Sequence, residues 1–131
     1  MPKIIAVSKT FRIEKILPLI EHGHRDFGEN KVQEALDKWS TIKETNSDIK
    51  IHLIGKLQTN KVKFAVKLFD YIHSVDSEKL AKKIVDEQNK INKKIKTFLQ
   101  VNIGDENQKS GIHKNEAHNL VSYCKEIGLD L

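Results

Sequence analysis

Two patterns of hydrophobic and polar residues alternate along the chain. Short apolar runs rich in β-branched and aromatic residues predict strands. They occur at residues 4–8, 25–28, 49–54, 71–75 and 97–103. Between these runs, apolar residues recur every three or four positions, which predicts amphipathic helices. The helices are expected around residues 13–20, 30–42, 60–68, 77–89 and 114–127, and residues 129–131 resemble the start of a sixth strand.

Strands that alternate with helices at this spacing predict βαβ units and a parallel sheet. Two architectures are compatible with that order, an open doubly wound sheet or a (β/α) barrel. No glycine-rich motif of the dinucleotide or P-loop type follows any strand, so those two functions lose their main support. The length predicts one domain over residues 1–131. Since a complete (β/α)₈ barrel needs about 200 residues or more, a barrel of this length would stop in mid-pattern.

The positive charge of the chain does not by itself indicate a nucleic-acid partner. Lys and Arg together number 23 against 18 Asp and Glu, which gives a formal net charge of +5. Only Arg12 and Arg25 are arginines, although arginine is the side chain that reads guanine edges and grips phosphate with two hydrogen bonds. The dense lysine run at 90–96 lacks the interleaved aromatic residues of single-strand binders. We therefore expect no nucleic-acid partner.

Cysteine usage and hydropathy favour a cytoplasmic protein. The single Cys124 excludes a disulfide framework within the chain and a multi-cysteine zinc site, and it is typical of a reducing compartment. The apolar runs fall far short of the roughly 20 residues that span a bilayer, so no membrane partner is expected. Because no basic and then apolar leader opens the chain, secretion is not expected either.

Lys9 is the first candidate for chemistry. It ends the first predicted strand, and ligands of parallel α/β proteins gather at the carboxyl ends of the strands. The two-residue period of a strand places Lys9 on the face of Ile5 and Val7. Desolvation among such apolar neighbours would favour the neutral amine, which forms a Schiff base with an aldehyde. The alternative is a solvated surface lysine, because the chain has 21 lysines.

Further candidates follow the second and third predicted strands. Asn30 with Gln33 matches a capping box, which predicts that Asn30 caps the next helix, a role compatible with ligand contact. His52 and His73 occupy corresponding places in the third and fourth strands, where a lone histidine is more often structural than catalytic. Neither an H-E-x-x-H motif nor a Cys/His spacing is present, so no metal site is expected. The polar loop 104–111 follows the fifth strand, where function often lies.

Four motifs at these strand ends carry a family resemblance. They are AVSKT at 6–10, FGEN at 27–30 with VQE at 32–34, HLIGKLQTNK at 52–61, and VNI at 101–103 through KSGI at 109–112. In this order and spacing they resemble the pyridoxal phosphate homeostasis proteins, which share the barrel of the alanine racemase N-terminal domain. The resemblance covers essentially all 131 residues.

This resemblance implies a parallel (β/α) TIM-type barrel, here about the first five to six βα units. It implies that Lys9 holds pyridoxal phosphate as a Schiff base, with Asn30 and His52 near the cofactor at the strand ends. The implied function is intracellular cofactor homeostasis by a regulatory protein without efficient turnover, so no catalytic residue is assigned. Racemisation would need a second acid/base partner on the opposite face of the cofactor, which another domain supplies in alanine racemase.

The chain also departs from the family pattern. A helix before the first strand and the last three βα units are expected to be missing, together with the late loops that hold the cofactor phosphate. An unclosed barrel leaves strand edges exposed, which favours self-association. Two alternatives therefore stay open: a pyridoxal phosphate-dependent, racemase-type enzyme acting on amino acids, and an inactive truncated barrel.

Overall fold

A five-stranded parallel sheet forms the centre of the molecule. The computed structural model describes residues 3–102 and 112–131. The strands lie in chain order, each parallel to the next. They are β1 (Ala6–Val7), β2 (Asp26–Glu29), β3 (Lys50–Leu53), β4 (Tyr71–Val75) and β5 (Lys96–Leu99). The parallel sheet predicted from the alternating pattern is confirmed.

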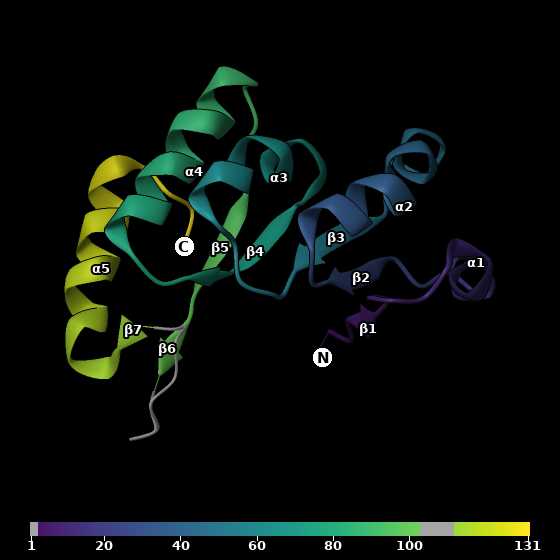
Figure 1. Ribbon diagram of the computed structural model, residues 1–131, viewed down its shortest axis with the longest axis horizontal. Helices are drawn as coiled ribbons and strands as arrows, with labels where there is room; N and C mark the ends of the chain where they lie inside the picture. The colour runs from purple at the N-terminus through teal and green to yellow at the C-terminus, as the bar shows by residue number, and fades with distance from the viewer. Residues whose placement is uncertain (1–2, 103–111) are drawn as a thin grey trace.

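Helices follow the strands along the chain. They are α1 (Ile13–Glu21), α2 (Val32–Thr45), η1 (Thr59–Lys61) leading into α3 (Val62–Leu68), α4 (Glu78–Lys90) and α5 (Lys114–Ile127). Helices α2, α3, α4 and α5 contact one another in chain order, as Figure 1 shows. Among the described residues, no helix combines the length and the apolar character that a membrane span requires.

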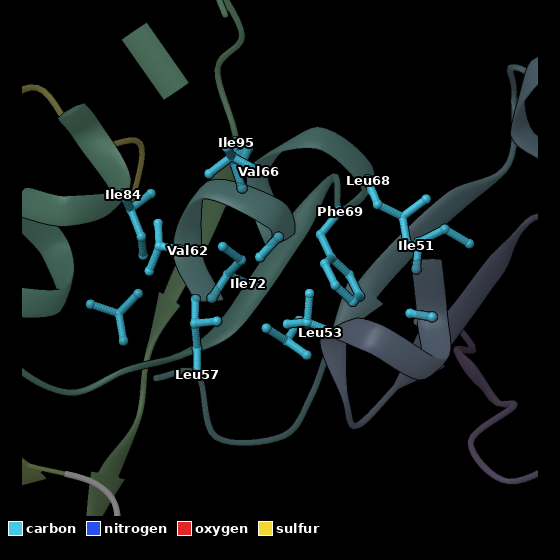
Figure 2. Close-up of a cluster of buried hydrophobic side chains, with 14 of the residues drawn as sticks. Ile51, Leu53, Leu57, Val62, Val66, Leu68, Phe69, Ile72, Ile84 and Ile95 are labelled. Atoms are coloured by element: carbon cyan, nitrogen blue, oxygen red, sulfur yellow. The ribbon is translucent and has the colours of Figure 1, made fainter. Parts of the chain in front are cut away.

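The hydrophobic core lies between the sheet and these helices. Ile51 and Leu53 of β3 and Ile72 of β4 are fully buried and face Val62 and Val66 of α3 across this core (Figure 2). Burying one such side chain stabilises a fold by about 1.5–3 kcal/mol. Since these residues alternate with polar ones along the strands, the apolar face of each strand is fixed toward the helices.

The other face of the sheet is more open. Val7 is 51% exposed, Ile54 is 36% exposed and Phe98 is 49% exposed. Gly28 belongs to this face, because a Cβ at that position would lie 3.2 Å from side-chain atoms of both Ile5 and Ile54. In a closed (β/α) barrel this face would be the filled interior.

Several predicted boundaries differ from the observed ones. The first strand is limited to Ala6–Val7 rather than 4–8, because only these two residues pair with β2. The predicted strand 97–103 is divided within the described residues, since β6 (Val101–Asn102) leaves the main sheet and pairs with β7 (Ile112–His113). The predicted loop 104–111 lies outside the described residues.

The carboxyl-terminal segment follows the prediction closely. Helix α5 covers the predicted 114–127, and Gly128 ends it in the left-handed conformation with φ of +85°. Asp130 then forms a parallel bridge with Lys96 of β5. Its carbonyl oxygen accepts hydrogen bonds of 2.7 Å from both the backbone N–H and the hydroxyl of Thr97. Residues 129–131, where the sequence predicts the start of a strand, thus contribute one parallel bridge beside β5.

Candidate functional site

Lys9 lies two residues after the end of β1, at the carboxyl edge of the sheet. Its side chain is exposed, and so is that of Val7 on the strand before it. The expected burial of Lys9 among apolar neighbours is therefore wrong, because the face of the sheet that would enclose it is open. An exposed primary amine at this edge is accessible to a ligand from solvent.

The backbone on both sides of Lys9 is held by side chains. The carbonyl oxygen of Ser8 accepts a hydrogen bond of 2.6 Å from Lys38 Nζ, and the N–H of Thr10 donates one of 2.6 Å to Glu34 Oε1. Thr10 has a φ of +65°, which is uncommon for a residue other than glycine. The segment Ser8–Thr10 thus has a defined shape that depends on α2.

A buried carboxylate, that of Glu29 at the end of β2, lies beneath this segment. Glu29 is fully buried and accepts hydrogen bonds from the hydroxyl of Ser8 and from Trp39 Nε1, the latter at 3.0 Å. Lys38 Nζ lies 3.0 Å from the same carboxylate, and the Lys38 side chain is 7% exposed. We call Glu29, Glu34 and Lys38 the charged cluster. The motif FGEN contains Glu29, and the strand period places it on the face of buried Phe27, which is the one signal in the sequence for a buried carboxylate here.

Asn30 follows β2 and does not cap the next helix. Lys31 is the N-cap residue of α2, and no side-chain hydrogen bond caps that end. The capping prediction is therefore wrong, because α2 begins at Val32, two residues later than predicted. Asn30 instead lies against Gly55 after β3, where any Cβ would overlap the side-chain and backbone oxygens of Asn30.

A pocket opens beside Asn30 at the carboxyl ends of β2 and β3. Its volume is about 360 Å³, and its lining includes three lysines. These are Lys31, Lys56 and Lys61. Lysine ammonium groups attract anions such as phosphate. The pocket therefore places positive charge next to the amide of Asn30.

His52 lies in β3, on the face of the sheet opposite to Ile51 and Leu53. Its Nε2 is 2.9 Å from Asp26 Oδ1, its Nδ1 is 2.9 Å from His73 Nε2, and its ring stacks on Tyr71 at 4.2 Å. Burial lowers the pKa of the His52 imidazole, although the hydrogen bond to Asp26 acts in the opposite direction. Both ring nitrogens are engaged within the protein, so the ring of His52 is held in one orientation, and its lowered pKa favours the neutral form at pH 7.

Strand register shows which candidates lie at the same level. Val7, Gly28 and His52 are partners across β1, β2 and β3. Lys9 and Asn30 each come two residues after this level, and therefore lie at the carboxyl ends of adjacent strands. His52 is one level deeper in the sheet. The structure thus brings Lys9 and Asn30 to one edge and places His52 beneath it.

Comparison with known proteins assigns the family. A sequence model of the family described as "Alanine racemase, N-terminal domain" matches residues 1–131. The chain belongs to this family. Its membership agrees with the resemblance that the four strand-end motifs carry.

Relatives of known sequence bear one common name. The pyridoxal phosphate homeostasis protein of Pasteurella multocida is 35% identical over 125 residues, covering 95% of this chain and 54% of that protein. The protein of the same name from Vibrio cholerae is 38% identical over 128 residues, with the same two coverages. That of Escherichia coli strain K12 is 36% identical over 125 residues, covering 95% and 53%. The chain spans about half the length of these relatives.

Solved structures give the same relationship for the fold. PipY of Synechococcus elongatus without pyridoxal phosphate has a TM-score of 0.86 and 36% identity, covering 94% of this chain and 57% of PipY. PipY with pyridoxal phosphate bound has a TM-score of 0.86 and 34% identity, covering 97% and 59%. A histidine racemase from Leuconostoc mesenteroides is 17% identical with a TM-score of 0.73, covering 96% and 34%, and shares the fold alone. The parallel (β/α) barrel type is therefore confirmed over the open doubly wound sheet.

Proposed function

We propose that this chain binds pyridoxal phosphate as a Schiff base on Lys9 and acts in cofactor homeostasis. The observation that carries the proposal is the exposed amine of Lys9 at the carboxyl end of β1, in a member of a family whose relatives include PipY with pyridoxal phosphate bound. Reversible binding, rather than turnover of a substrate, is the proposed role. The name of the curated relatives supports it.

The residues at this edge fit the chemistry of the cofactor. Pyridoxal phosphate supplies an aldehyde, an aromatic ring and a phosphate. Lys9 offers a primary amine, and Asn30 offers an amide held against Gly55. The lysine-lined pocket beside Asn30 offers positive charge for an anionic group. No carboxylate lines that pocket, so a phosphate would meet no like charge among its lining residues.

The proposed reaction uses the Lys9 amine as nucleophile. The neutral Nζ of Lys9 would add to the aldehyde carbon of the cofactor and form a C=N bond, and the two amine hydrogens would leave with the aldehyde oxygen as water. The reverse reaction with water releases the cofactor and restores the amine. Because no oxidant or second substrate is consumed, the chain can take up and release the cofactor repeatedly.

Asn30 and His52 are proposed to support the bound cofactor in different ways. Asn30 lies at the level of Lys9, so its amide is in position to donate to or accept from the ligand. His52 lies one level deeper with both ring nitrogens engaged by Asp26 and His73. Its proposed contribution is a neutral, fixed ring below the cofactor.

Two further properties belong to this proposal. The exposed apolar residues Val7, Ile54 and Phe98 on the open face of the sheet support self-association of the 131-residue chain. Cys124 is a free, buried thiol, and burial raises its pKa. An unreactive thiol of this kind is compatible with the proposed cytoplasmic location.

Borohydride trapping tests the proposed function. The chain is incubated with pyridoxal phosphate, reduced with borohydride, digested, and its labelled peptides are mapped. We expect selective labelling at Lys9 and its loss in Lys9→Ala. The matched control is Lys79→Ala, which removes an exposed lysine on α4 and should leave the labelling unchanged. Labelling spread over many lysines, and equal in all three proteins, would refute the proposal.

A further inference from the structure

We propose that Glu34 and Lys38 of α2 are positioning residues that hold the Lys9 segment in the shape required for capture of an aldehyde. This inference rests on the proposed function. It concerns residues that do not themselves contact the cofactor. The charged cluster forms hydrogen bonds to Ser8 and Thr10, the residues on each side of Lys9.

The first set of hydrogen bonds holds Ser8. Lys38 Nζ donates to the Ser8 carbonyl oxygen at 2.6 Å and also lies 3.0 Å from the Glu29 carboxylate. The Ser8 hydroxyl in turn donates to the same carboxylate. Because Glu29 and Lys38 are both buried, these hydrogen bonds are shielded from water and strengthened by the low local dielectric.

A second hydrogen bond holds Thr10. Its N–H donates to Glu34 Oε1 at 2.6 Å, and the same oxygen lies 3.7 Å from Lys38 Nζ. Thr10 has a φ of +65°, a left-handed conformation that is strained for a residue with a Cβ. The hydrogen bond to Glu34 offsets this strain. Loss of the Glu34 carboxylate would therefore release Thr10 toward ordinary backbone angles.

The hydrogen bonds to Ser8 and Thr10 together determine the position of the Lys9 backbone, and so the region that the Lys9 amine can reach. A flexible lysine side chain reaches many positions, and its attack on an aldehyde is efficient only when its Cα is fixed relative to the bound ligand. The side chains that make these hydrogen bonds, Glu34 and Lys38, lie on successive turns of one 14-residue helix, α2. Helix α2 therefore aligns the end of β1 with the end of β2, where Asn30 lies.

Variants of Glu34 test this inference, since its side chain is 31% exposed and its removal spares the buried pair beneath. Glu34→Ala removes the acceptor of the Thr10 N–H, whereas Glu34→Gln retains an oxygen at the same place. The matched control is Glu44→Ala, which removes an exposed carboxylate at the other end of α2. Two quantities are measured in each protein: the rate of Schiff-base formation with pyridoxal phosphate, followed by its absorption band, and hydrogen exchange at the Thr10 amide without cofactor.

We expect Glu34→Ala to slow Schiff-base formation roughly tenfold or more and to remove protection of the Thr10 amide. Glu34→Gln and Glu44→Ala should resemble the unchanged protein in both measurements. Schiff-base formation at the unchanged rate in Glu34→Ala, with the Thr10 amide unprotected, would overturn the positioning role alone. A protected Thr10 amide with no reaction at Lys9 in the unchanged protein would instead refute the proposed function, and the positioning role with it.

Discussion

Nδ1 of His52 lies 2.9 Å from Nε2 of His73 on the neighbouring strand. The Asp26 carboxylate, on the other side of His52, only accepts hydrogen bonds, so Nε2 of His52 carries the hydrogen. In the neutral His52 ring, which burial favours, Nδ1 therefore accepts from Nε2 of His73. A protonated His52 would instead donate from Nδ1, and His73 would have to carry its hydrogen on Nδ1 in order to accept it.

Stability should therefore fall as the solution is acidified. Burial lowers the pKa of His52 and of His73 below the ordinary value of 6.5, and the neighbouring His52 lowers that of His73 further. Because the unfolded chain then binds protons more tightly than the folded chain, the free energy of unfolding decreases as pH falls through 6.5. Urea unfolding at pH 7.5 and at pH 5.5, both reported as free energies, measures this loss.

Histidine variants identify the source of that pH dependence. His73→Gln should reduce the difference in unfolding free energy between the two pH values. His118→Gln, which changes an exposed histidine of α5, should leave the difference as it is. An identical pH dependence in all three proteins would show that the His52–His73 pair does not cause it.

The buried pair of Lys38 and Glu29 gives a second prediction. Lys38→Met leaves the fully buried Glu29 carboxylate without its cation, which should cost about 3–5 kcal/mol of unfolding free energy. Adding Glu29→Gln removes the unpaired buried charge and should restore part of the unfolding free energy that Lys38→Met loses. Denaturant unfolding of both single variants and the double variant gives the coupling energy, expected between about 0.5 and 3 kcal/mol. Strictly additive losses would contradict the pairing.

The contact of Gly55 with Asn30 gives a third prediction. Gly55→Ala places a Cβ onto the Asn30 oxygens and should cost about 1–3 kcal/mol, because backbone and side chain must both shift. Gly28→Ala is the control variant, in which the added Cβ is less crowded than in Gly55→Ala. Its Cβ would meet Ile5 and Ile54 at 3.2 Å, and the partly exposed Ile54 can move, so a smaller loss is expected. Equal unfolding free energies for the two variants would argue against the close approach of Asn30.

Two serines of the β4–α4 region give a fourth prediction. Ser77 caps α4, since its hydroxyl accepts from the Leu80 N–H at 3.1 Å, and Ser77→Ala should cost about 1 kcal/mol. The buried Ser74 hydroxyl has no hydrogen-bond partner among the described residues. Ser74→Ala should therefore be neutral or stabilising, by up to about 1 kcal/mol. Thermal unfolding of the two variants measures the difference in their stabilities. A loss of stability in Ser74→Ala equal to that in Ser77→Ala would contradict the prediction for Ser74.

The sequence by itself determined the alternation of strands and helices and the parallel sheet. These features depend on local periodicity, which places Ile51 and Leu53 on one face of β3 whatever surrounds them. The position of Lys9 at a strand end follows from the same pattern. Strand ends were less certain, as the short β1 shows, because pairing with a neighbour rather than local composition decides where a strand ends.

Only the tertiary structure decided what surrounds each candidate residue. The hydrogen bond from Thr10 to Glu34 joins residues 24 positions apart, and the contact of His52 with His73 joins residues 21 positions apart. Asn30 fitted a capping box in the sequence, yet it lies against Gly55 because the register of β2 and β3 brings their ends together. Such contacts depend on strand register and helix placement, which the packing of the whole core determines and local spacing does not encode.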